Sequence, residues 1–571
     1  MTTRRTRTAV AATTVTFLVV SMAATPSALA TPAEMRGPTI EYTVLADEGV
    51  SVDAAAKAIT GAGGTVLDRN DDVGLFRVAA PESGFVERAG ATPQLAGAAR
   101  RVPVGHAPRD KPATVERENT ATPTAGGPAA PAGRHHPDTP TPDPLDDKLW
   151  GLQMINADRA HTVTGGSRKV SVGILDTGVD ASNPDIAEHF STSLSRNFAK
   201  DLVDVDGPCE VASCLDPVGT DDNGHGTHVA GTIGAAANGV GVTGIAPEVT
   251  LVELKGGQDS GYFFLEPVVN ALTYAGRAGI DVVNMSFYVD PWLFNCTSNA
   301  ADSPTAQAEQ RTIIAAMSRA LTFAHRHGVT LVAALGNEHQ DLGSPLPDLT
   351  SPDYPAGTAY PRPVDNATCL NLPTEGPFVI GVSALGPSGK KSDFSNYGTE
   401  QISVAAPGGW FRDGYGTPTF RTDGNMILSA YPKNVLQAEG SVDAEGNVVP
   451  DMADSVFKDC TPDGRCGYYT YLQGTSMASP HAAGVAALIV SRYGRPDPRH
   501  WGTLGLDPSV VESVLLRTAA EHACPVPALQ TYTNEGRSAE FNALCVGDTA
   551  FNGFYGHGVI DAYAAVTVGR H

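Results

Sequence analysis

The sequence predicts an α/β protein: a three-layer α/β/α domain with a mostly parallel central sheet, preceded by a small α+β domain. Two observations predict the larger domain. Short Val- and Ile-rich runs recur after residue 143, and segments of helix length separate them. Near-continuous apolar strands that alternate with helices are typical of a parallel sheet covered on both faces. The expected strands are 170–175, 250–254, 281–285, 330–334 and 378–382, and 305–327 is an expected crossover helix.

The first 30 residues are predicted to be a secretory signal peptide. Three arginines lie within the first seven residues, residues 9–24 are largely apolar, and Ala28-Leu29-Ala30 is a small-x-small cleavage site. A membrane anchor is the alternative, but this apolar run is short for a bilayer and contains several threonines. We therefore expect a secreted protein without a membrane anchor.

Residues 31–106 are predicted to form a small α+β domain with a ferredoxin-like β-α-β-β-α-β order. The expected strands are 39–46, 64–67, 73–78 and 101–104, and the expected first helix is 51–62. Residues 107–142 are rich in Pro, Ala, Thr and Gly without a hydrophobic period, which predicts an exposed linker before the main domain, 143–571. The linker favours a removable pro-segment, with a permanently tethered domain as the alternative.

Composition and charge narrow the class of protein. With 571 residues, 42% of them hydrophobic and 18% charged, the chain is that of a globular protein long enough for more than one domain. Its formal net charge of −23 disfavours nucleic acids and anionic membranes as partners.

The eight cysteines are expected to form disulfides, because an exported chain reaches an oxidising compartment. Eight cysteines allow about a hundred connectivities, and the sequence alone does not choose among them. A zinc site is disfavoured because the chain contains no CxxC pair. Pairing by neighbourhood gives Cys209–Cys214, Cys296–Cys369, Cys460–Cys466 and Cys524–Cys545.

Four residues with side chains suited to catalysis lie near the ends of predicted strands or the starts of predicted helices. Functional groups of parallel α/β proteins gather at this edge of the sheet. Asp176 and Asn337 each follow an expected strand, and His225 lies on a glycine-rich loop that opens a helix. Ser476 precedes a long Ala-rich helix whose Pro480 is expected within the first turn, where a missing N–H costs little. Taken singly, Asp176 could serve a turn and Ser476 a helix cap.

Together these side chains predict acyl transfer. A base removes the proton of a serine hydroxyl, a carboxylate fixes the tautomer of that base, and preorganised donors stabilise the oxyanion. His228, three residues after His225, raises a metal site as an alternative. A zinc-protease helix, however, carries histidines at i and i+4 with a glutamate between them, and that glutamate is missing here.

The motifs around these residues resemble those of the subtilisin family of serine proteases, the subtilases, in the chain order of that family. They are Asp176-Thr177-Gly178, His225-Gly226-Thr227-His228-Val229-Ala230-Gly231 and Gly474-Thr475-Ser476-Met477-Ala478-Ser479-Pro480. The resemblance covers residues 143–566 and, more loosely, the pro-segment, which resembles the family's inhibitory, chaperone-like propeptide. It implies a secreted, self-processing zymogen that hydrolyses peptide bonds as a monomer and needs no cofactor for catalysis.

The resemblance also implies a role for each site residue. Asp176 orients the base, His225 acts as general base and then acid, and Ser476 is the nucleophile. The Asn337 side chain and the Ser476 N–H bind the oxyanion, whereas His228 and His481 match no catalytic position. The implied substrate-binding residues are Ser286, Phe287, Tyr288 and Gly336.

The chain departs from the family pattern at two places. Phe287-Tyr288 stand where the family has Leu-Gly, which puts bulk at the expected specificity pocket. One long insertion follows, through Pro291-Trp292 and Cys296. A second insertion spans residues 410–469. These insertions either line the substrate cleft or decorate the surface.

A structural calcium ion bound by oxygen ligands is also expected from the resemblance. Asp185 follows a proline in a turn, and Asn238-Gly239 is an ordinary loop dipeptide, so both also have a local explanation. The implied ligands are the side chains of Asp146, Asp185 and Asn238 and the backbone carbonyls of Ala236, Val240 and Val242.

Two other functions fit the sequence less well. A non-catalytic binding scaffold would be expected to have lost at least one of the four catalytic residues, and all four are present. An esterase or lipase would carry a G-x-S-x-G elbow with its histidine after the serine. Here Ser476 lies in Gly-Thr-Ser-Met-Ala and follows His225 in the chain.

Overall fold

The computed structural model describes residues 38–100, 116–117 and 142–568 of the chain. The expected signal peptide, the strand expected at 101–104 and most of the linker lie outside these residues. Within them, no helix combines the length and the hydrophobicity needed to cross a bilayer.

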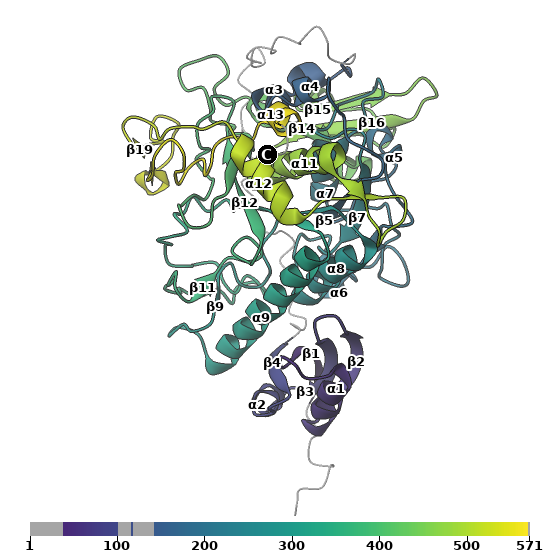
Figure 1. Cartoon of the computed structure of the whole chain (residues 1–571), viewed down its shortest axis with the longest axis vertical. Helices are drawn as coiled ribbons and strands as arrows, with labels where there is room; N and C mark the ends of the chain where they lie inside the picture. The colour runs from purple at the N-terminus through teal and green to yellow at the C-terminus, as the bar shows by residue number, and fades with distance from the viewer. Residues whose placement is uncertain (1–37, 101–115, 118–141, 569–571) are drawn as a thin grey trace, which may run out of the picture.

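Seven parallel strands form the central sheet, in the order β13-β12-β10-β8-β5-β7-β6 (Figure 1). All five strands expected from the sequence are present, with ends shifted by no more than a few residues. The two additional strands lie at the sheet edges: β6 is too short to leave an apolar run, and β13 ends in a proline. The bounds are β5 Ser171–Leu175, β6 Arg196–Asn197, β7 Thr250–Lys255, β8 Val282–Met285, β10 Thr330–Ala334, β12 Val379–Leu385 and β13 Val404–Pro407.

Helices cover both faces of this sheet, which confirms the three-layer α/β/α prediction. Side chains of successive strand residues point to opposite faces, and accordingly Ile174 lies in one hydrophobic core and Leu175 in the other. Helices α7, α11, α12 and α13 pack on the first core, and α8 and α9 pack on the second. Their bounds are α7 His225–Gly234, α8 Leu265–Ala278, α9 Pro304–Arg326, α11 Thr475–Tyr493, α12 Pro508–Thr518 and α13 Ala562–Thr567.

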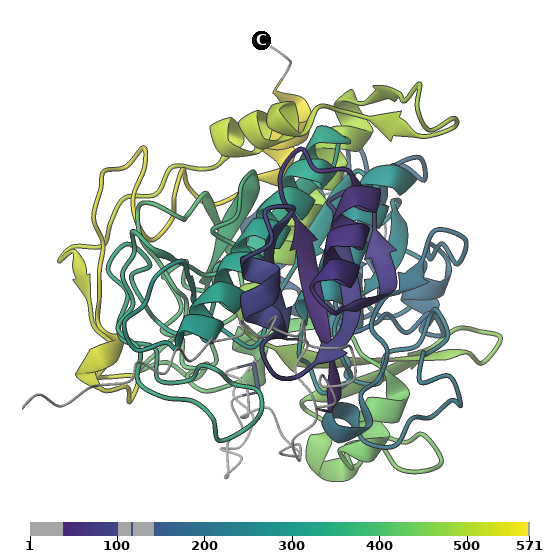
Figure 2. The ribbon, with the colours of Figure 1, turned by 90° about the horizontal axis from the view of Figure 1, so that it is seen from below.

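A small α+β unit precedes the main domain and packs against α8 and α9 (Figure 2). Its four strands form an antiparallel sheet in the order β2-β3-β1-β4, and its helices have their own core. At the contact with the main domain, Arg319 on α9 donates to the carbonyl of Ala46 at 2.7 Å. The bounds are β1 Thr39–Ala46, α1 Val52–Gly61, β2 Thr65–Asn70, β3 Leu75–Pro81, α2 Phe85–Gly90 and β4 Leu95–Arg100.

Strand β4, Leu95–Arg100, was not predicted from the sequence, because it is composed mainly of small residues and therefore lacks a strong hydrophobic signal. The small residues have a structural reason, because β4 lies directly on α9. A Cβ atom on Gly97 would come within 2.4 Å of Thr312 Oγ1.

The remaining elements are short and belong mainly to loops and insertions. The insertion at 410–469 contributes most of a three-stranded antiparallel sheet, β14-β16-β15, whose first strand packs on α7. The four disulfides confirm the pairing by neighbourhood. The bounds are α3 Trp150–Met154, α4 Ala157–Ala160, α5 Pro184–Ala187, α6 Val203–Asp206, β9 Asn295–Cys296, β11 Cys369–Leu370, β14 Ile427–Ala430, α10 Lys433–Ala438, β15 Val456–Cys460, β16 Cys466–Leu472, β17 Arg495–Pro496, β18 Leu504–Gly505, β19 Leu529–Gln530 and β20 Ala543–Leu544.

Candidate active site

Asp176 and His225 are brought together at the carboxyl end of β5. Asp176 follows the last residue of β5 and is fully buried, and His225 is the first residue of α7. Nδ1 of His225 lies 2.7 Å from Oδ1 of Asp176. The N–H groups of Gly256 and Gly257 donate to the backbone carbonyl of Asp176 at 3.0 and 3.1 Å, which fixes the loop after β5. A buried carboxylate in this position holds the imidazole in one tautomer.

Asp221 is a supporting residue that the sequence did not single out. One of its carboxylate oxygens accepts from the Thr177 hydroxyl at 3.1 Å and from the Gly224 N–H at 2.9 Å. The other accepts from the N–H and the hydroxyl of Thr227 at 2.9 and 2.6 Å. Asp221 thus ties the loop of Asp176 to the first turn of α7. The available signal was an acidic residue just before a helix start.

Ser476 lies in the first turn of α11 and is 4% exposed. Pro480 is the sixth residue of this helix, not part of its first turn as expected, and its missing N–H leaves the Ser476 carbonyl without an intrahelical donor. The Ser286 hydroxyl supplies that donor and lies 3.1 Å from the Ser476 carbonyl oxygen. Ser286 therefore compensates for the proline and helps to hold the serine loop in place.

Asn337 is held by the residue that precedes Ser476. Its side-chain oxygen accepts from both the N–H and the hydroxyl of Thr475 at 2.9 Å. Because the oxygen is occupied in this way, the amide nitrogen is left as the donor that can serve an oxyanion. The nitrogen faces Gly474, since a Cβ atom there would lie 3.5 Å from it. Gly336 has no room for a side chain, because a Cβ atom would come within 2.4 Å of Asn396 Nδ2.

Glu116, one of three linker residues that the structure describes, lies at this centre. Its Oε1 is 3.4 Å from Nε2 of His225, and its backbone carbonyl accepts from the N–H of Gln473 at 3.2 Å. The Ser476 hydroxyl lies 3.4 Å from the Ser286 carbonyl oxygen. Among the hydrogen bonds of the described residues, none joins His225 to Ser476, so Glu116 takes the imidazole nitrogen that a nucleophile would use.

Two carboxylates determine the charge of His225. Burial by itself would lower the pKa of the imidazole. The negative charges of Asp176 and Glu116, together with their hydrogen bonds to the ring, outweigh burial and raise the pKa well above its ordinary value of 6.5. In the presence of Glu116 the imidazole is therefore held in its protonated form.

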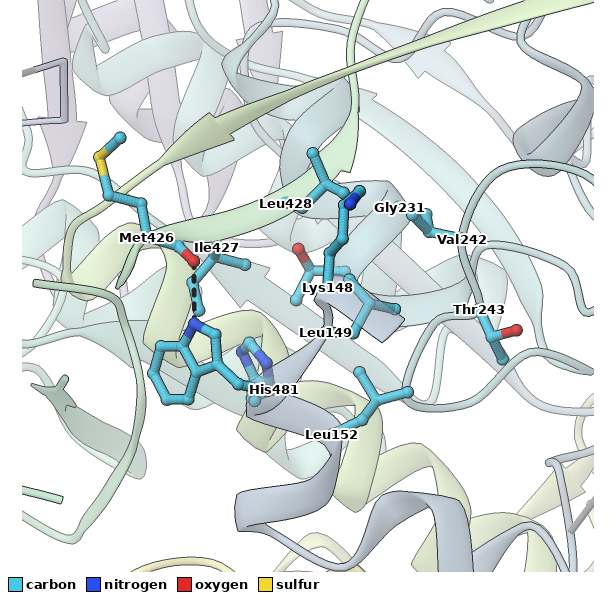
Figure 3. A pocket seen from close by; sticks show the side chains of 13 residues that line it. Lys148, Leu149, Leu152, Gly231, Val242, Thr243, Met426, Ile427, Leu428 and His481 are labelled. Atoms are coloured by element: carbon cyan, nitrogen blue, oxygen red, sulfur yellow. Dashed lines mark hydrogen bonds between the residues drawn. The ribbon is translucent and has the colours of Figure 1, made fainter. Parts of the chain in front are cut away.

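The other two histidines near the motifs face the protein interior. Nε2 of His228 lies 3.0 Å from the Ile427 carbonyl, and burial lowers the pKa of His228 to about 3. Nδ1 of His481 lies 2.7 Å from the Met477 carbonyl, and burial lowers its pKa to about 4. His481 borders a small pocket behind the serine helix that is lined largely by apolar side chains (Figure 3). Neither environment provides a partner for proton transfer to a substrate.

The side chains of Phe287 and Tyr288 are each held by a contact with another side chain. The Phe287 ring stacks on Phe263 with centroids 4.1 Å apart. The Tyr288 hydroxyl donates to Asp353 at 2.7 Å. Their role in substrate binding remains a prediction.

The loop expected to bind calcium is held by hydrogen bonds of its own. Oδ1 of Asp146 accepts from the Thr243 N–H at 2.8 Å, and Oδ2 accepts from the Thr243 hydroxyl at 2.9 Å. The side-chain oxygen of Asn238 accepts from the Val240 N–H at 3.0 Å. These oxygens already have protein donors.

Asp185 lies in the same loop, and burial raises its pKa to about 8. Its Oδ2 accepts from the Val242 N–H at 3.0 Å and from the Tyr469 hydroxyl at 2.9 Å, whereas Oδ1 is buried without a hydrogen-bond partner. The Asp185 backbone carbonyl accepts from the Ala236 N–H at 2.9 Å. The side-chain oxygens of Asp146 and Asn238 thus have protein donors, whereas Asp185 Oδ1 has none, and calcium binding at this loop remains a prediction.

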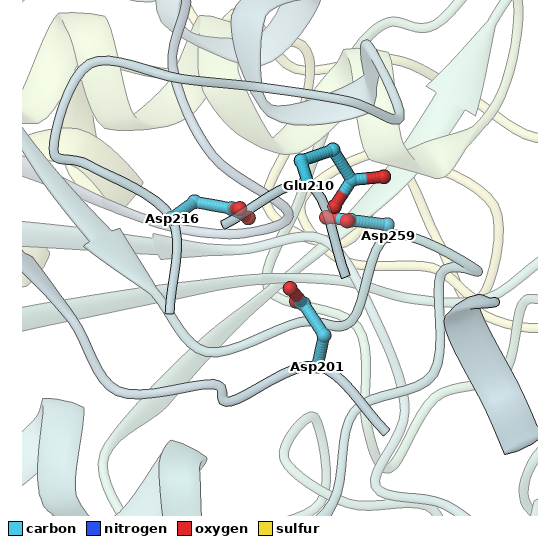
Figure 4. A group of neighbouring side chains, drawn as sticks. All are labelled: Asp201, Glu210, Asp216 and Asp259. Carbon is cyan, nitrogen blue, oxygen red and sulfur yellow. The ribbon is translucent and has the colours of Figure 1, made fainter. Parts of the chain in front are cut away.

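A separate cluster of acidic side chains also offers oxygen ligands for a cation. The side chains of Asp201, Glu210, Asp216 and Asp259 each offer one oxygen, and these oxygens lie within 4.8 Å of one another (Figure 4). Asp201 is 4% exposed, and neither of its carboxylate oxygens has a hydrogen-bond partner. Burial and the charges of Asp259 and Asp216 raise the pKa of Asp201 to about 7. Oxygen-only ligands suit calcium.

Lys255 supplies part of the positive charge at this cluster. Its Nζ lies 2.5 Å from Asp259 and 3.2 Å from Asp216, and it also donates to the Thr177 carbonyl at 2.7 Å. One lysine balances only one of the four carboxylates. No sequence motif points to the cluster, because its members lie in separate loops between residues 201 and 259.

Comparison with known proteins identifies the family that the chain resembles. A model described as the subtilase family matches residues 167–558. Subtilisin DY of Bacillus licheniformis is 29% identical over 344 residues, which are 60% of this chain and 85% of that protein. Thermitase of Thermoactinomyces vulgaris is 27% identical over 355 residues, which are 62% of this chain and 86% of that protein.

Solved structures show the same fold. The epidermin leader peptide processing serine protease of Staphylococcus aureus matches with a TM-score of 0.58 and 18% identity, over 93% of this chain and 99% of that one. Fervidolysin of Fervidobacterium pennivorans, described as a keratinolytic enzyme related to subtilisin, matches with a TM-score of 0.54 and 19% identity over 93% of this chain and 61% of that one.

Proposed function

Because the chain belongs to the subtilase family of serine-type endopeptidases, we propose that it is a secreted, self-processing peptidase acting through an acyl-enzyme on Ser476. The observation that carries this proposal is the buried Asp176 carboxylate 2.7 Å from His225, at the sheet edge where the serine helix begins. Acyl transfer requires this arrangement of carboxylate, imidazole and hydroxyl.

The proposed reaction starts when neutral His225 removes the proton of Ser476 and the hydroxyl oxygen attacks a peptide carbonyl. The amide nitrogen of Asn337 and the backbone N–H of Ser476 stabilise the oxyanion that forms. His225 then donates its proton to the leaving amine, and a water molecule hydrolyses the acyl-enzyme by the same route in reverse. Asp176 stabilises the imidazolium in both steps.

The small N-terminal unit is proposed to act as an intramolecular inhibitor and folding aid of a monomeric enzyme. It packs on α8 and α9 through a sheet with its own core. Glu116, further along the same connection, lies against His225. Cleavage of the linker would release this unit, and the eight cysteines suit a secreted product.

A structural calcium ion is proposed at the cluster of Asp201, Glu210, Asp216 and Asp259. The two unpartnered oxygens of Asp201 support this position. Glu210 belongs to a loop that the Cys209–Cys214 disulfide closes, which fixes the ligand that is otherwise exposed. The ion would stabilise the loops between Asp176 and His225 and would take no part in the chemical step.

The function is tested by comparing the secreted wild-type chain with Ser476→Ala. The wild type should cleave a mixed peptide library, and its N-terminus should lie between residues 107 and 142 or directly after them. The variant should lose roughly 10⁴- to 10⁶-fold in kcat and should retain the pro-segment. N-terminal sequencing and a chromogenic peptide assay measure both. Normal processing of purified Ser476→Ala would rule out self-cleavage.

A further inference from the structure

The linker dipeptide Glu116-Arg117 lies against the catalytic centre like a bound peptide. The Glu116 carbonyl pairs with the N–H of Gln473, which directly precedes the serine loop. A Cβ atom on Gly474 would lie 3.3 Å from Cγ of Glu116, so the peptide and the serine loop are in contact. Backbone pairing of this kind lets an extended peptide bind with little dependence on sequence, and side-chain subsites then provide specificity.

The side chain of Arg117 occupies a site formed by Tyr431 and Glu439. Its guanidinium carbon lies 4.9 Å from the centroid of the Tyr431 ring, and its Nη1 forms an ion pair with the Glu439 carboxylate. In the folded chain the Arg117 and Glu439 side chains are 34% and 30% exposed. The guanidinium is therefore partly desolvated between a ring face and a carboxylate.

This site is held rigidly beside the catalytic histidine. Tyr431 directly follows β14, is 4% exposed, and donates its hydroxyl to the Asn223 carbonyl at 3.2 Å. Gly224 leaves room for the tyrosine ring, because a Cβ atom there would come within 2.3 Å of it. Glu439 follows the last residue of α10. Both residues belong to the insertion at 410–469, so the site is a feature of this chain's own insertion.

The chemistry of the site selects arginine. A planar guanidinium can lie over an aromatic ring while its N–H groups bind a carboxylate, whereas the ammonium group of lysine is a compact, more strongly hydrated charge. A neutral side chain would make neither interaction, and an acidic one would face Glu439 directly.

We propose that Tyr431 and Glu439 form a subsite for an arginine side chain of the peptide substrate, and that Arg117 fills this subsite in the unprocessed chain. The inference rests on the proposed peptidase function and adds the substrate class: peptides with an arginine at one fixed position near the cleaved bond. It also places Glu116 and Arg117 in the substrate cleft before processing.

The test uses the processed enzyme and a peptide library, with the cleaved bonds identified by mass spectrometry. Arginine should be enriched at one fixed position within a few residues of the cleaved bond. Peptides that carry Arg, Lys, Gln or Glu at that position then give kcat/KM ratios. The wild type should prefer Arg over Gln by about tenfold, which combines a cation–π contact with a partly exposed ion pair.

Variants of the insertion separate the subsite from general effects on activity. Glu439→Gln should bring the Arg/Gln ratio close to one, and Glu439→Lys should favour the Glu peptide. Tyr431→Phe keeps the ring and should keep the preference, whereas Tyr431→Leu should weaken it. Glu445→Gln, an exposed glutamate in the same insertion, is the matched control and should leave the ratio unchanged.

The outcomes distinguish this inference from the proposed function. Peptide cleavage that depends on Ser476 but shows no preference for arginine would overturn the subsite alone. The same holds if the preference persists in both Glu439 variants. Absence of any Ser476-dependent cleavage would overturn the proposed function and the subsite with it.

Discussion

The charge of one imidazole decides whether this active site can work. His225 can accept the proton of Ser476 only when it is neutral. Asp176 lies on one ring nitrogen at 2.7 Å and Glu116 near the other at 3.4 Å, and their charges raise the pKa of His225 despite its burial. The third titratable group facing the ring, His228, is buried in its neutral form. Glu116 therefore blocks the base chemically as well as by its position.

Glu116→Gln should lower the pKa of His225, because the amide removes one of the two negative charges that stabilise the imidazolium. The measurement is an NMR titration of the imidazole in Ser476→Ala, which keeps the linker attached. By linkage, Glu116 should dock most tightly at pH values below the raised pKa and should loosen as the pH rises through it. An unchanged pKa in the Gln variant would show that Glu116 does not contact the ring in solution.

Asn337→Asp should lower kcat by about 100- to 1,000-fold with little change in KM, because it removes a donor that acts in the transition state. The aspartate retains an oxygen that can accept from Thr475, so the loop geometry is expected to persist. Steady-state kinetics of the processed enzyme measures both constants. A loss seen mainly in KM would assign Asn337 to substrate binding instead.

At the scale of elements, buried polar contacts hold the insertions and loops on the α/β core. Ser286, directly after β8, replaces the hydrogen bond that Pro480 removes from α11. A second buried contact involves Arg362, which is fully buried. Its guanidinium group lies 2.8 Å from the Asp302 carboxylate and 2.9 Å from the Asp348 carboxylate. It also donates to Gln310 on α9 at 2.8 Å, so one side chain joins three segments.

Arg362→Ala should lower the free energy of unfolding by about 3–5 kcal/mol, because removal of the guanidinium leaves two buried carboxylates unpaired. The matched control is Arg465→Ala, whose ion pair with Asp463 is exposed and should contribute little to stability. Chemical denaturation in a Ser476→Ala background measures both without self-digestion. Equal effects of the two substitutions would contradict the interpretation.

At the scale of the whole molecule, the two faces of one parallel sheet pack into two hydrophobic cores. The loops at the carboxyl edge of this sheet hold the candidate catalytic residues. The same loops hold the acidic cluster of Asp201, which Lys255 links to the backbone beside Asp176. The pKa of Asp201 is raised to about 7, mainly by burial and then by its acidic neighbours. Without a cation, the Asp201 carboxyl group contributes to folding stability at pH values below the ordinary carboxyl pKa. This contribution is lost as the pH rises towards 7.

Calcium should therefore stabilise the protein more at pH 8 than at pH 5. At a free calcium concentration of 100 times Kd the gain should be about 3 kcal/mol. Thermal unfolding of Ser476→Ala with calcium or EGTA measures it. The response should disappear in Asp201→Asn and persist in Asp185→Asn, which distinguishes the acidic cluster from the loop that the sequence favours. Loss of the response only in Asp185→Asn would reverse the assignment.

The sequence by itself predicted the strand runs, the long helix α9 and the family, and it singled out Asp176, His225 and Ser476 as candidate catalytic residues, because hydrophobic period and short motifs are local properties. Pairing by neighbourhood predicted the four disulfides, but only the tertiary structure selected this pairing among the possible connectivities. Only the tertiary structure decided that Glu116 meets His225, that Ser286 supports Ser476 and that Asp201 lacks a partner. The first two contacts join residues 109 and 190 positions apart in the chain, and the third depends on burial. Strand order and packing create such neighbours, and no stretch of sequence carries that information.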